Sequence, residues 1–454
     1  MLLQRLIRRP LMLALVLVPL SCAWAQPQQQ QRIPRPAAPA ASAVPVPVSA
    51  TARKVYERAR SQLLQIRTLL KNQDSQASVG SGFLVSSEGH IVTNYHVISQ
   101  VALEPERYRL QYETTDGRQG QLELLDFDVR RDLALLRADP AKLQATGALS
   151  FRAKEQPLSK GDRIYSMGNP HDVAFAVVEG TYNGLVERSF DPLIYYSGSI
   201  NSGMSGGPVV DEEGRVVGIN VSAMFFAQQM SFLVPAEFAQ ALFERSRGAK
   251  AIKSAAWPRL KDQLMAYQDE LSKRFMEQPW RAAGHARYTL PVPQEQFFRC
   301  WGRGTPADTK GLEFQRSQCR MDHAVFISGG MQTGYLDMSH EAYDGRKLGA
   351  IRFSRQYSAS FRNERLGRDD KDRTAPYCRE EFVDQGGLPL RAVVCLRAYR
   401  KLDGLHDLSI LVTTVDAKTE GALGRFDAKG VSFDNALKLT SHYLGGFGWA
   451  AKPR

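Results

Sequence analysis

Short stretches of alternating apolar and polar residues dominate the first half of the chain. Residues 79–86 alternate, Ser87 to Gly89 supply a turn, and residues 90–94 read as the returning strand of a hairpin. The stretch 63–70 is ambiguous between helix and strand, and we favour a strand. Further strands are predicted at 108–113, 121–127, 133–137, 164–167, 175–178, 181–186 and 194–196. Residues 95–98 are expected to end the strand that begins at residue 90. Many short strands without a strand–helix–strand rhythm predict a β-barrel or a β-sandwich.

Helical periodicity is confined to a few segments. A short charged helix is expected at 51–62 and a second helix at 235–247. Residues 258–277 predict a longer amphipathic helix whose apolar positions are spaced by three and four: Leu260, Leu264, Tyr267, Leu271 and Phe275. A helix that packs between domains is favoured over a membrane-surface or coiled-coil helix, because the apolar stripe covers barely three heptads.

The pattern changes again after Trp280. Strands are predicted at 324–328, 349–353, 391–398 and 408–415, and a final helix at 433–443, before Gly445 and Gly446. We expect an α+β module here and assign it to no family.

The first residues have the pattern of an export signal. Arg5, Arg8 and Arg9 precede the apolar run 11–20, and the sequence 23–25 is Ala-Trp-Ala. The run is short for a bilayer span, so we expect cleavage after residue 25. The alternatives are an uncleaved anchor, or lipid attachment at Cys22, which Pro19 disfavours. Residues 26–50, rich in Gln, Pro and Ala, predict a disordered tether.

Composition narrows the classes of function. A chain of 454 residues with 43% hydrophobic and 23% charged residues is typical of a globular protein of two or more domains. The formal net charge of +12 becomes +9 without the three arginines of the signal. The basic stretch 362–373 also contains acidic residues, which indicates a solvated face, and we expect no nucleic-acid partner. No stable membrane span is expected after signal cleavage.

The cysteines predict disulfides in the second half of the chain. Without Cys22 four remain: Cys300, Cys319, Cys378 and Cys395. An even number in an exported chain indicates two disulfides, and three pairings are open. We favour Cys300–Cys319 and Cys378–Cys395, because each closes a short local loop. Zinc is the competing interpretation, but no spacing fits a metal site, so neither a metal nor another cofactor is expected.

The stretch 202–208, Ser-Gly-Met-Ser-Gly-Gly-Pro, carries the candidate chemistry. Its glycines allow backbone N–H groups to gather beside the Ser205 hydroxyl, as an acyl-transfer nucleophile requires. A nucleophilic serine needs a general base and a group that orients the base. His96 follows one predicted strand, and Asp132 precedes another. Taken singly each has an ordinary structural explanation, but the order His, Asp, Ser is that of chymotrypsin-type barrels.

Seven segments in register now make a family resemblance specific. Residues from about 63 to 245 resemble the protease domain of the trypsin-like HtrA/Deg family. The matching segments are 80–83, 93–97, 132–136, 167–170, 203–208, 218–220 and 231–235. The resemblance implies a chymotrypsin-like double β-barrel in which Ser205 is the nucleophile, His96 the general base and Asp132 the residue that orients it. The backbone N–H groups of Gly203 and Ser205 would form the oxyanion hole.

The same resemblance suggests a specificity pocket. Ser199, six residues before the nucleophile, would lie at its base, and the absence of an acid there disfavours Lys and Arg. The walls would come from Ile219, Asn220, Val221 and Phe232, which favours small or medium apolar side chains. Two departures from the family stand out: Met204 replaces the usual Asn, and no PDZ domain is recognisable after Pro235.

These observations predict a mainly β protein with five segments: a signal peptide at 1–25, a tether at 26–50, a trypsin-like protease domain at 51–248, a helical linker at 249–285, and an α+β domain at 286–454. The expected function is that of a periplasmic or secreted serine endopeptidase that acts on proteins or peptides. The alternative is a weakly active or latent barrel that acts as a sensor through its C-terminal domain.

Overall fold

A computed structural model describes residues 49–144, 147–223, 230–281, 287–294, 296–306, 308–362 and 366–450. The predicted signal peptide and nearly all of the predicted tether lie outside these residues. Within the described part, no helix is both long enough and apolar enough to cross a membrane.

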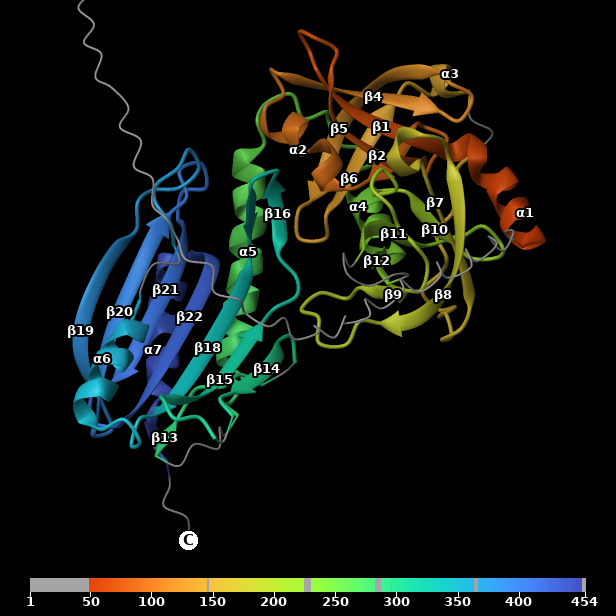
Figure 1. The fold of residues 1–454 in the computed structure, drawn as a ribbon. Coiled ribbons are helices and arrows are strands. Elements are labelled where there is room, and N and C mark those ends of the chain that lie inside the picture. Colours follow the sequence, from red (N-terminus) through yellow and green to blue (C-terminus); the bar gives the residue numbers. More distant parts are fainter. Residues whose placement is uncertain are drawn as a thin grey trace, which may run out of the picture. The chain divides into compact units, whose positions relative to one another are not determined.

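Two closed six-stranded barrels form the first half of the described chain, which confirms the predicted double barrel (Figure 1). In the first barrel the strand order is β1-β2-β3-β6-β5-β4. Its strands are β1 (Leu63–Leu70), β2 (Gln76–Leu84), β3 (His90–Thr93), β4 (Tyr108–Thr114), β5 (Gln119–Asp128) and β6 (Leu133–Ala138). In the second barrel the order is β10-β11-β12-β9-β8-β7. Its strands are β7 (Arg163–Gly168), β8 (Ala176–Leu185), β9 (Ile194–Tyr196), β10 (Pro208–Val210), β11 (Val216–Ala223) and β12 (Ser231–Pro235).

Helices and turns connect and flank the barrels. They are α1 (Ala50–Ala59), η1 (Arg60–Gln62), α2 (Tyr95–Leu103), α3 (Pro140–Leu143), η2 (Pro170–Asp172) and α4 (Ala236–Ser246). The prediction that residues 95–98 end a strand is wrong, because α2 begins at Tyr95. Asn94, which has an extended backbone, lies between the end of β3 and the first residue of the helix. The apolar residues Ile98 and Ala102 are then four apart and both are fully buried. The two strands predicted at 175–178 and 181–186 are one strand, β8.

A seven-stranded antiparallel sheet forms the core of the C-terminal module, in the order β14-β15-β18-β22-β21-β20-β19. Its strands are β14 (Arg299–Gly304), β15 (Glu313–Arg320), β18 (Tyr335–Asp344), β19 (Tyr377–Gln385), β20 (Leu388–Ala398), β21 (Leu405–Thr414) and β22 (Glu420–Ser432). The remaining elements are α5 (Trp257–Met276), α6 (Ala350–Ser360), α7 (Phe433–Gly445), the hairpin β16 (Val325–Ser328) and β17 (Met331–Thr333), and the pair β13 (Tyr288–Thr289) and β23 (Gly448–Trp449).

The strand predicted at 349–353 is wrong, because α6 begins at Ala350. Gly349 has a φ of +72°, which ends the preceding turn and sets the direction of the helix. Phe353 and Tyr357 lie one helical turn apart and stack with ring centroids 5.1 Å apart. Of the short run read as a strand, Phe353 is buried, whereas Ile351 is 89% exposed.

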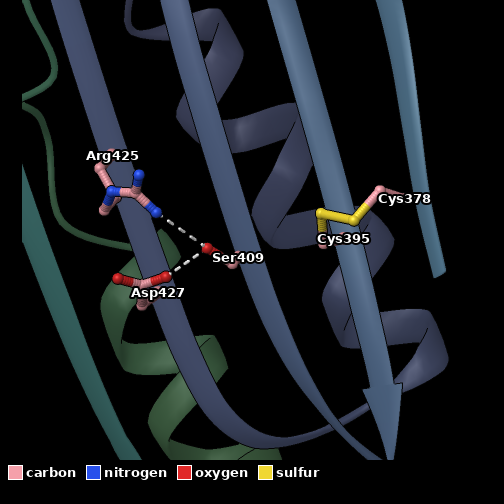
Figure 2. The surroundings of a disulfide bond; sticks show 5 residues. All are labelled: Cys378, Cys395, Ser409, Arg425 and Asp427. Carbon is pink, nitrogen blue, oxygen red and sulfur yellow. Dashed lines mark hydrogen bonds between the residues drawn. A yellow bond between two sulfur atoms is a disulfide. The ribbon is translucent and has the colours of Figure 1, made fainter. Parts of the chain in front are cut away.

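Both disulfides join directly opposite residues on neighbouring strands. Cys300 pairs with Cys319 across β14 and β15, and Cys378 with Cys395 across β19 and β20. This is the sequential pairing that the sequence favours. Figure 2 shows the second disulfide. It also shows the hydrogen bond that the Ser409 hydroxyl on β21 donates to the Asp427 carboxylate on β22 at 2.5 Å. The disulfides thus tie both outer pairs of strands in the sheet.

One hydrophobic core joins the first barrel to the C-terminal sheet. It contains Leu64 of β1, Leu264 of α5 and Phe426 of β22 among its buried residues. Helix α5 contacts both β22 and α7. The five apolar positions predicted along α5 are all buried, so the helix is a central packing element.

Candidate active site

The first turn of α2 brings His96 to Asp132, the residue that precedes β6. Strand β3 pairs with β6, and at its end the side chain of Asn94 donates to the Asp132 carbonyl at 2.8 Å. The N–H of Tyr95 donates to the same carbonyl at 3.1 Å. Asp132 has a φ of +55°, a conformation that a non-glycine residue adopts only when its surroundings hold it. The junction between strand and helix therefore fixes the backbones of both residues.

The Asp132 carboxylate accepts two hydrogen bonds from His96. The backbone N–H of His96 donates to Oδ1 at 2.8 Å, and Nδ1 lies 2.5 Å from Oδ2. Because a carboxylate has no proton to donate, Nδ1 carries the proton and Nε2 of the neutral imidazole is left as an acceptor. Burial lowers the pKa of His96, but the charge and the hydrogen bond of Asp132 together outweigh it, so the pKa is raised above 6.5.

The glycine loop before β10 packs against the end of β3. A Cβ atom on Gly206 would lie 2.4 Å from both Ser81 O and Thr93 Oγ1 and 2.8 Å from Asn94 N. Only a glycine allows so close an approach, and the φ of Gly206 is +84°. The carbonyl of Ser205 accepts from the N–H of Ser81 at 2.8 Å. These contacts hold Ser205 next to the residues that immediately precede His96.

Two backbone N–H groups in this loop are available to a ligand. The Ser202 carbonyl accepts from the N–H of His171 at 2.7 Å. Because a trans peptide is planar, the N–H of Gly203 points the opposite way. In the described part of the chain, neither this N–H nor that of Ser205 donates to a protein acceptor. Gly203 has a φ of +92°, and a Cβ atom there would lie 2.4 Å from the Asn169 carbonyl.

Two polar side chains fasten the loop to both barrels. Ser81 donates to the Gly203 carbonyl at 2.7 Å and accepts from the N–H of Asn169 at 2.9 Å. The side-chain amide of Asn220 donates to the carbonyls of Met167 and Met204 at 3.1 and 3.2 Å. The role of Ser81 could not be predicted, because its hydroxyl bonds Gly203 and Asn169, which lie 122 and 88 positions away in the sequence.

The residues predicted to form a specificity pocket occupy different environments. Ser199 is exposed, and Val221 and Phe232 are half-buried. Ile219 and Asn220 are fully buried in the second barrel. Any contact of these two residues with a substrate would therefore come from main-chain atoms. Met204, the departure from the family pattern, is also fully buried and packs in the core of this barrel.

The hairpin β16–β17 of the C-terminal module contacts the same site. The ring of Phe326 lies edge-on to His96, with centroids 6.0 Å apart and planes at 74°. Tyr95 donates its hydroxyl to the Ile327 carbonyl at 3.1 Å. No feature of the sequence links residues 230 positions apart, so this neighbour of His96 was not foreseen.

The imidazole of His96, whose side chain is 30% exposed, and the hydroxyl of Ser205 form no hydrogen bond with each other among the described residues. Such bonds are often long in ligand-free serine hydrolases and tighten when substrate binds.

Comparisons with known proteins agree with this geometry. Residues 80–219 match the trypsin-like peptidase domain. The chain is 28% identical over 277 residues to "Serine protease HTR4" of Bos taurus, a match that covers 58% of this chain and 51% of that protein. It is 30% identical over 183 residues to "Probable periplasmic serine endoprotease DegP-like" of Ectopseudomonas mendocina, covering 38% of this chain and 36% of that protein. The chain thus spans about half of the first relative and about a third of the second.

A solved structure has also been matched. The serine endoprotease from Yersinia pestis is 24% identical, with a TM-score of 0.38, over 44% of this chain and 67% of that chain. The matched residues 80–219 include His96, Asp132 and Ser205. Residues 80–219 are therefore similar to a trypsin-like peptidase domain, and the relatives matched are named as serine proteases.

Proposed function

We propose that the protein is an exported serine endopeptidase that hydrolyses peptide bonds through a triad of Ser205, His96 and Asp132. One observation carries the proposal: the Asp132 carboxylate accepts from both the backbone N–H and Nδ1 of His96, beside a glycine loop that presents Ser205. This arrangement leaves Nε2 as the acceptor that a general base requires.

The proposed reaction has two halves. Ser205 Oγ attacks the scissile carbonyl carbon while His96 Nε2 takes its proton, and the resulting imidazolium is stabilised by Asp132. The oxyanion binds the N–H groups of Gly203 and Ser205, each of which is worth roughly 3–4 kcal/mol in comparable sites. The imidazolium then protonates the leaving amine, which departs and leaves an acyl-enzyme. Water, deprotonated by His96, hydrolyses the ester and regenerates Ser205.

The substrates proposed are proteins or peptides outside the cytoplasm. The export pattern of residues 1–25 and the two disulfides support this location. A relative named as periplasmic agrees with it. We propose cleavage after small or medium apolar residues, because no acid stands at Ser199 to bind Lys or Arg.

Covalent labelling tests the proposal. A serine-directed fluorophosphonate should label the wild-type chain and leave Ser205→Ala unlabelled, and cleavage of a denatured proteome should require Ser205. Ser87→Ala, an exposed serine on a nearby turn, is the matched control and should label like the wild type. Absence of labelling in a folded wild-type chain, with or without peptide substrate, would refute the peptidase.

The second candidate function, a latent barrel that acts as a sensor, is favoured by one observation. Ser205 and His96 are not hydrogen-bonded among the described residues, and a C-terminal hairpin covers one edge of the imidazole. Labelling of the intact chain that appears only after a peptide ligand is added would favour this function. Truncation is a poorer test, because residues 286–454 contribute to the core shared with the first barrel.

A further inference from the structure

A cavity of about 390 Å³ lies beside Asp132, and its walls come from two distant parts of the chain. Val129, Asp132 and Val221 line it from the barrels. Ala324 and Phe326 line it from the C-terminal module, on the hairpin β16–β17 and the residue before it. A volume of this size falls in the range of ligand pockets, roughly 300–1,000 Å³.

The lining combines apolar side chains with polar and charged ones, among them Arg131, Asp322 and His323. Val129, Val221, Val325 and Phe326 present hydrocarbon. Asp191 is only 4% exposed; one of its oxygens accepts from Arg130 Nε at 2.7 Å. Its other oxygen, Oδ2, has no hydrogen-bond partner within the described residues. This oxygen is itself buried, so Asp191 forms part of the wall and presents no free acceptor to a ligand in the cavity.

The cavity and the candidate general base share a wall. Phe326 lines the cavity and also packs its ring edge-on against His96. Asp132 lines the cavity and holds Nδ1 of His96. His96 and Ser205 are not among the residues that line the cavity, so a substrate would enter it with a side chain that neighbours the scissile bond and passes Phe326.

We propose that this cavity is a substrate subsite built jointly by the barrels and the hairpin, and that it takes an apolar side chain near the scissile bond. The inference rests on the proposed peptidase function and adds to it the part of the chain that sets its selectivity. The C-terminal module then contributes directly to the substrate-binding cleft.

A second cavity in the C-terminal module serves as a contrast. It has about 380 Å³ and is lined by Arg320, Asp337 and Lys429 among others, so charged groups dominate it. It suits an apolar side chain poorly. Of these two cavities, the one beside Asp132 combines hydrocarbon walls with contact to the carboxylate that binds Nδ1 of His96.

Two substitutions change the cavity in opposite senses. Ala324→Phe fills it from the C-terminal side, and Phe326→Ala enlarges it. The readout is the cleavage profile on proteome-derived peptides, expressed as ratios of kcat/KM between residues at each position. Such ratios cancel any common loss of rate that arises because Phe326 also touches His96. Active-site titration with a small fluorophosphonate counts the competent nucleophiles in each preparation.

We expect the wild type to favour an apolar residue at one position near the scissile bond. Ala324→Phe should lower that preference, relative to Gly, by about 10-fold, and Phe326→Ala should shift it towards larger side chains such as Phe and Trp by a similar factor. Phe326→Leu should restore much of the original profile. Ala359→Phe, an exposed position on α6, is the matched control and should leave the profile unchanged.

The outcomes separate the two proposals. Titratable Ser205 with profiles that are the same in wild type, Ala324→Phe and Phe326→Ala would overturn the subsite and leave the peptidase intact. An unlabelled wild-type chain would overturn the peptidase and the subsite with it. If Ala324→Phe fails to fold, the opposite shift expected for Phe326→Ala still decides the question.

Discussion

At the scale of single residues, the pair His96–Asp132 determines how activity should depend on pH. Asp132 raises the pKa of His96 above 6.5, and the general base must be neutral. Activity should therefore fall as the pH drops through a value above 6.5. Asp132→Asn removes the negative charge and the carboxylate hydrogen bond that raise the pKa of His96. The residual activity should therefore persist to lower pH, and kcat should fall by about 10⁴-fold. The measurement is the profile of kcat/KM against pH for the wild type and Asp132→Asn. If activity falls at the same acidic pH in both, the prediction is wrong.

Ser81 offers a second test at this scale. Its hydroxyl bonds the Gly203 carbonyl and the Asn169 N–H, and the residue is 1% exposed. Ser81→Ala leaves both buried groups without this partner, so the free energy of unfolding should fall by about 2 kcal/mol. Fluorophosphonate labelling should slow, because Gly203 is no longer held. Denaturant unfolding and labelling rates measure the two effects. Ser87→Ala, at an exposed position, should change the free energy of unfolding by less than about 0.5 kcal/mol. If Ser81→Ala and Ser87→Ala lowered it equally, Ser81 would not bridge Gly203 and Asn169.

The sequence could identify the candidate catalytic residues because each sits in a locally recognisable setting. Ser205 lies between glycines, and Asp132 stands directly before an apolar strand. The side chains of Ile219 and Asn220 could not be placed in the same way. Both lie on β11, where the direction of a side chain depends on the barrel that closes around it. The φ of +55° at Asp132 likewise follows from contacts with Asn94 and Tyr95, which local sequence does not encode.

At the scale of elements, the glycine loop before β10 allows a matched comparison. Gly206 and Gly214 have φ values of +84° and +85°. A Cβ on Gly206 would lie 2.4 Å from Ser81 O, whereas at Gly214 no atom lies within 4 Å. Gly214→Ala should therefore lower the free energy of unfolding by about 1–2 kcal/mol, because a residue with a side chain disfavours the left-handed backbone conformation. Gly206→Ala must also displace the loop, so labelling of Ser205 should fall by about 100-fold or more. Labelling rates and unfolding curves test this, and similar behaviour of the two variants would refute the close packing.

The spacing of apolar residues predicted a helix or strand well where the element buries one face. Strand β4, whose buried positions alternate, and the helices α4 and α5 follow their apolar periodicity. The pattern was misread at 95–98 and 349–353, where short apolar runs are compatible with either a strand or a helix. The hairpin β16–β17 shows a different limit. Its first strand was predicted, but its place beside His96 depends on contacts across more than 200 residues.

At the scale of the molecule, the shared core predicts that the barrels and the C-terminal module unfold together. Residues 48–454 form one compact unit, and buried residues of β1, α5 and β22 belong to one hydrophobic core. The apolar surface of this core is divided between both halves, so this core is incomplete in either half alone. The linker predicted at 249–285 contains α5, which packs inside this core. A single cooperative transition is therefore expected.

Two independent probes and one substitution test this cooperativity. The described tryptophans, Trp257, Trp280, Trp301 and Trp449, all lie outside the barrels and report on α5 and the C-terminal module. Labelling of Ser205 reports on the barrels. Both signals should be lost at the same denaturant concentration. Leu264→Ala, at a position 1% exposed in the middle of α5, should move both midpoints down together through a loss of about 2–5 kcal/mol.

Leu437→Ala on α7, where Leu437 is 54% exposed, is the matched control and should move neither midpoint appreciably. If labelling survived in denaturant after the tryptophan signal had gone, the barrels would fold independently, and the predicted linker would be a true domain boundary. If the midpoints coincide and Leu264→Ala shifts them equally, the C-terminal module is part of the folding unit that holds His96. A module that folds with the barrels presents Phe326 to His96 whenever the barrels are folded, which is the condition that a jointly built subsite requires.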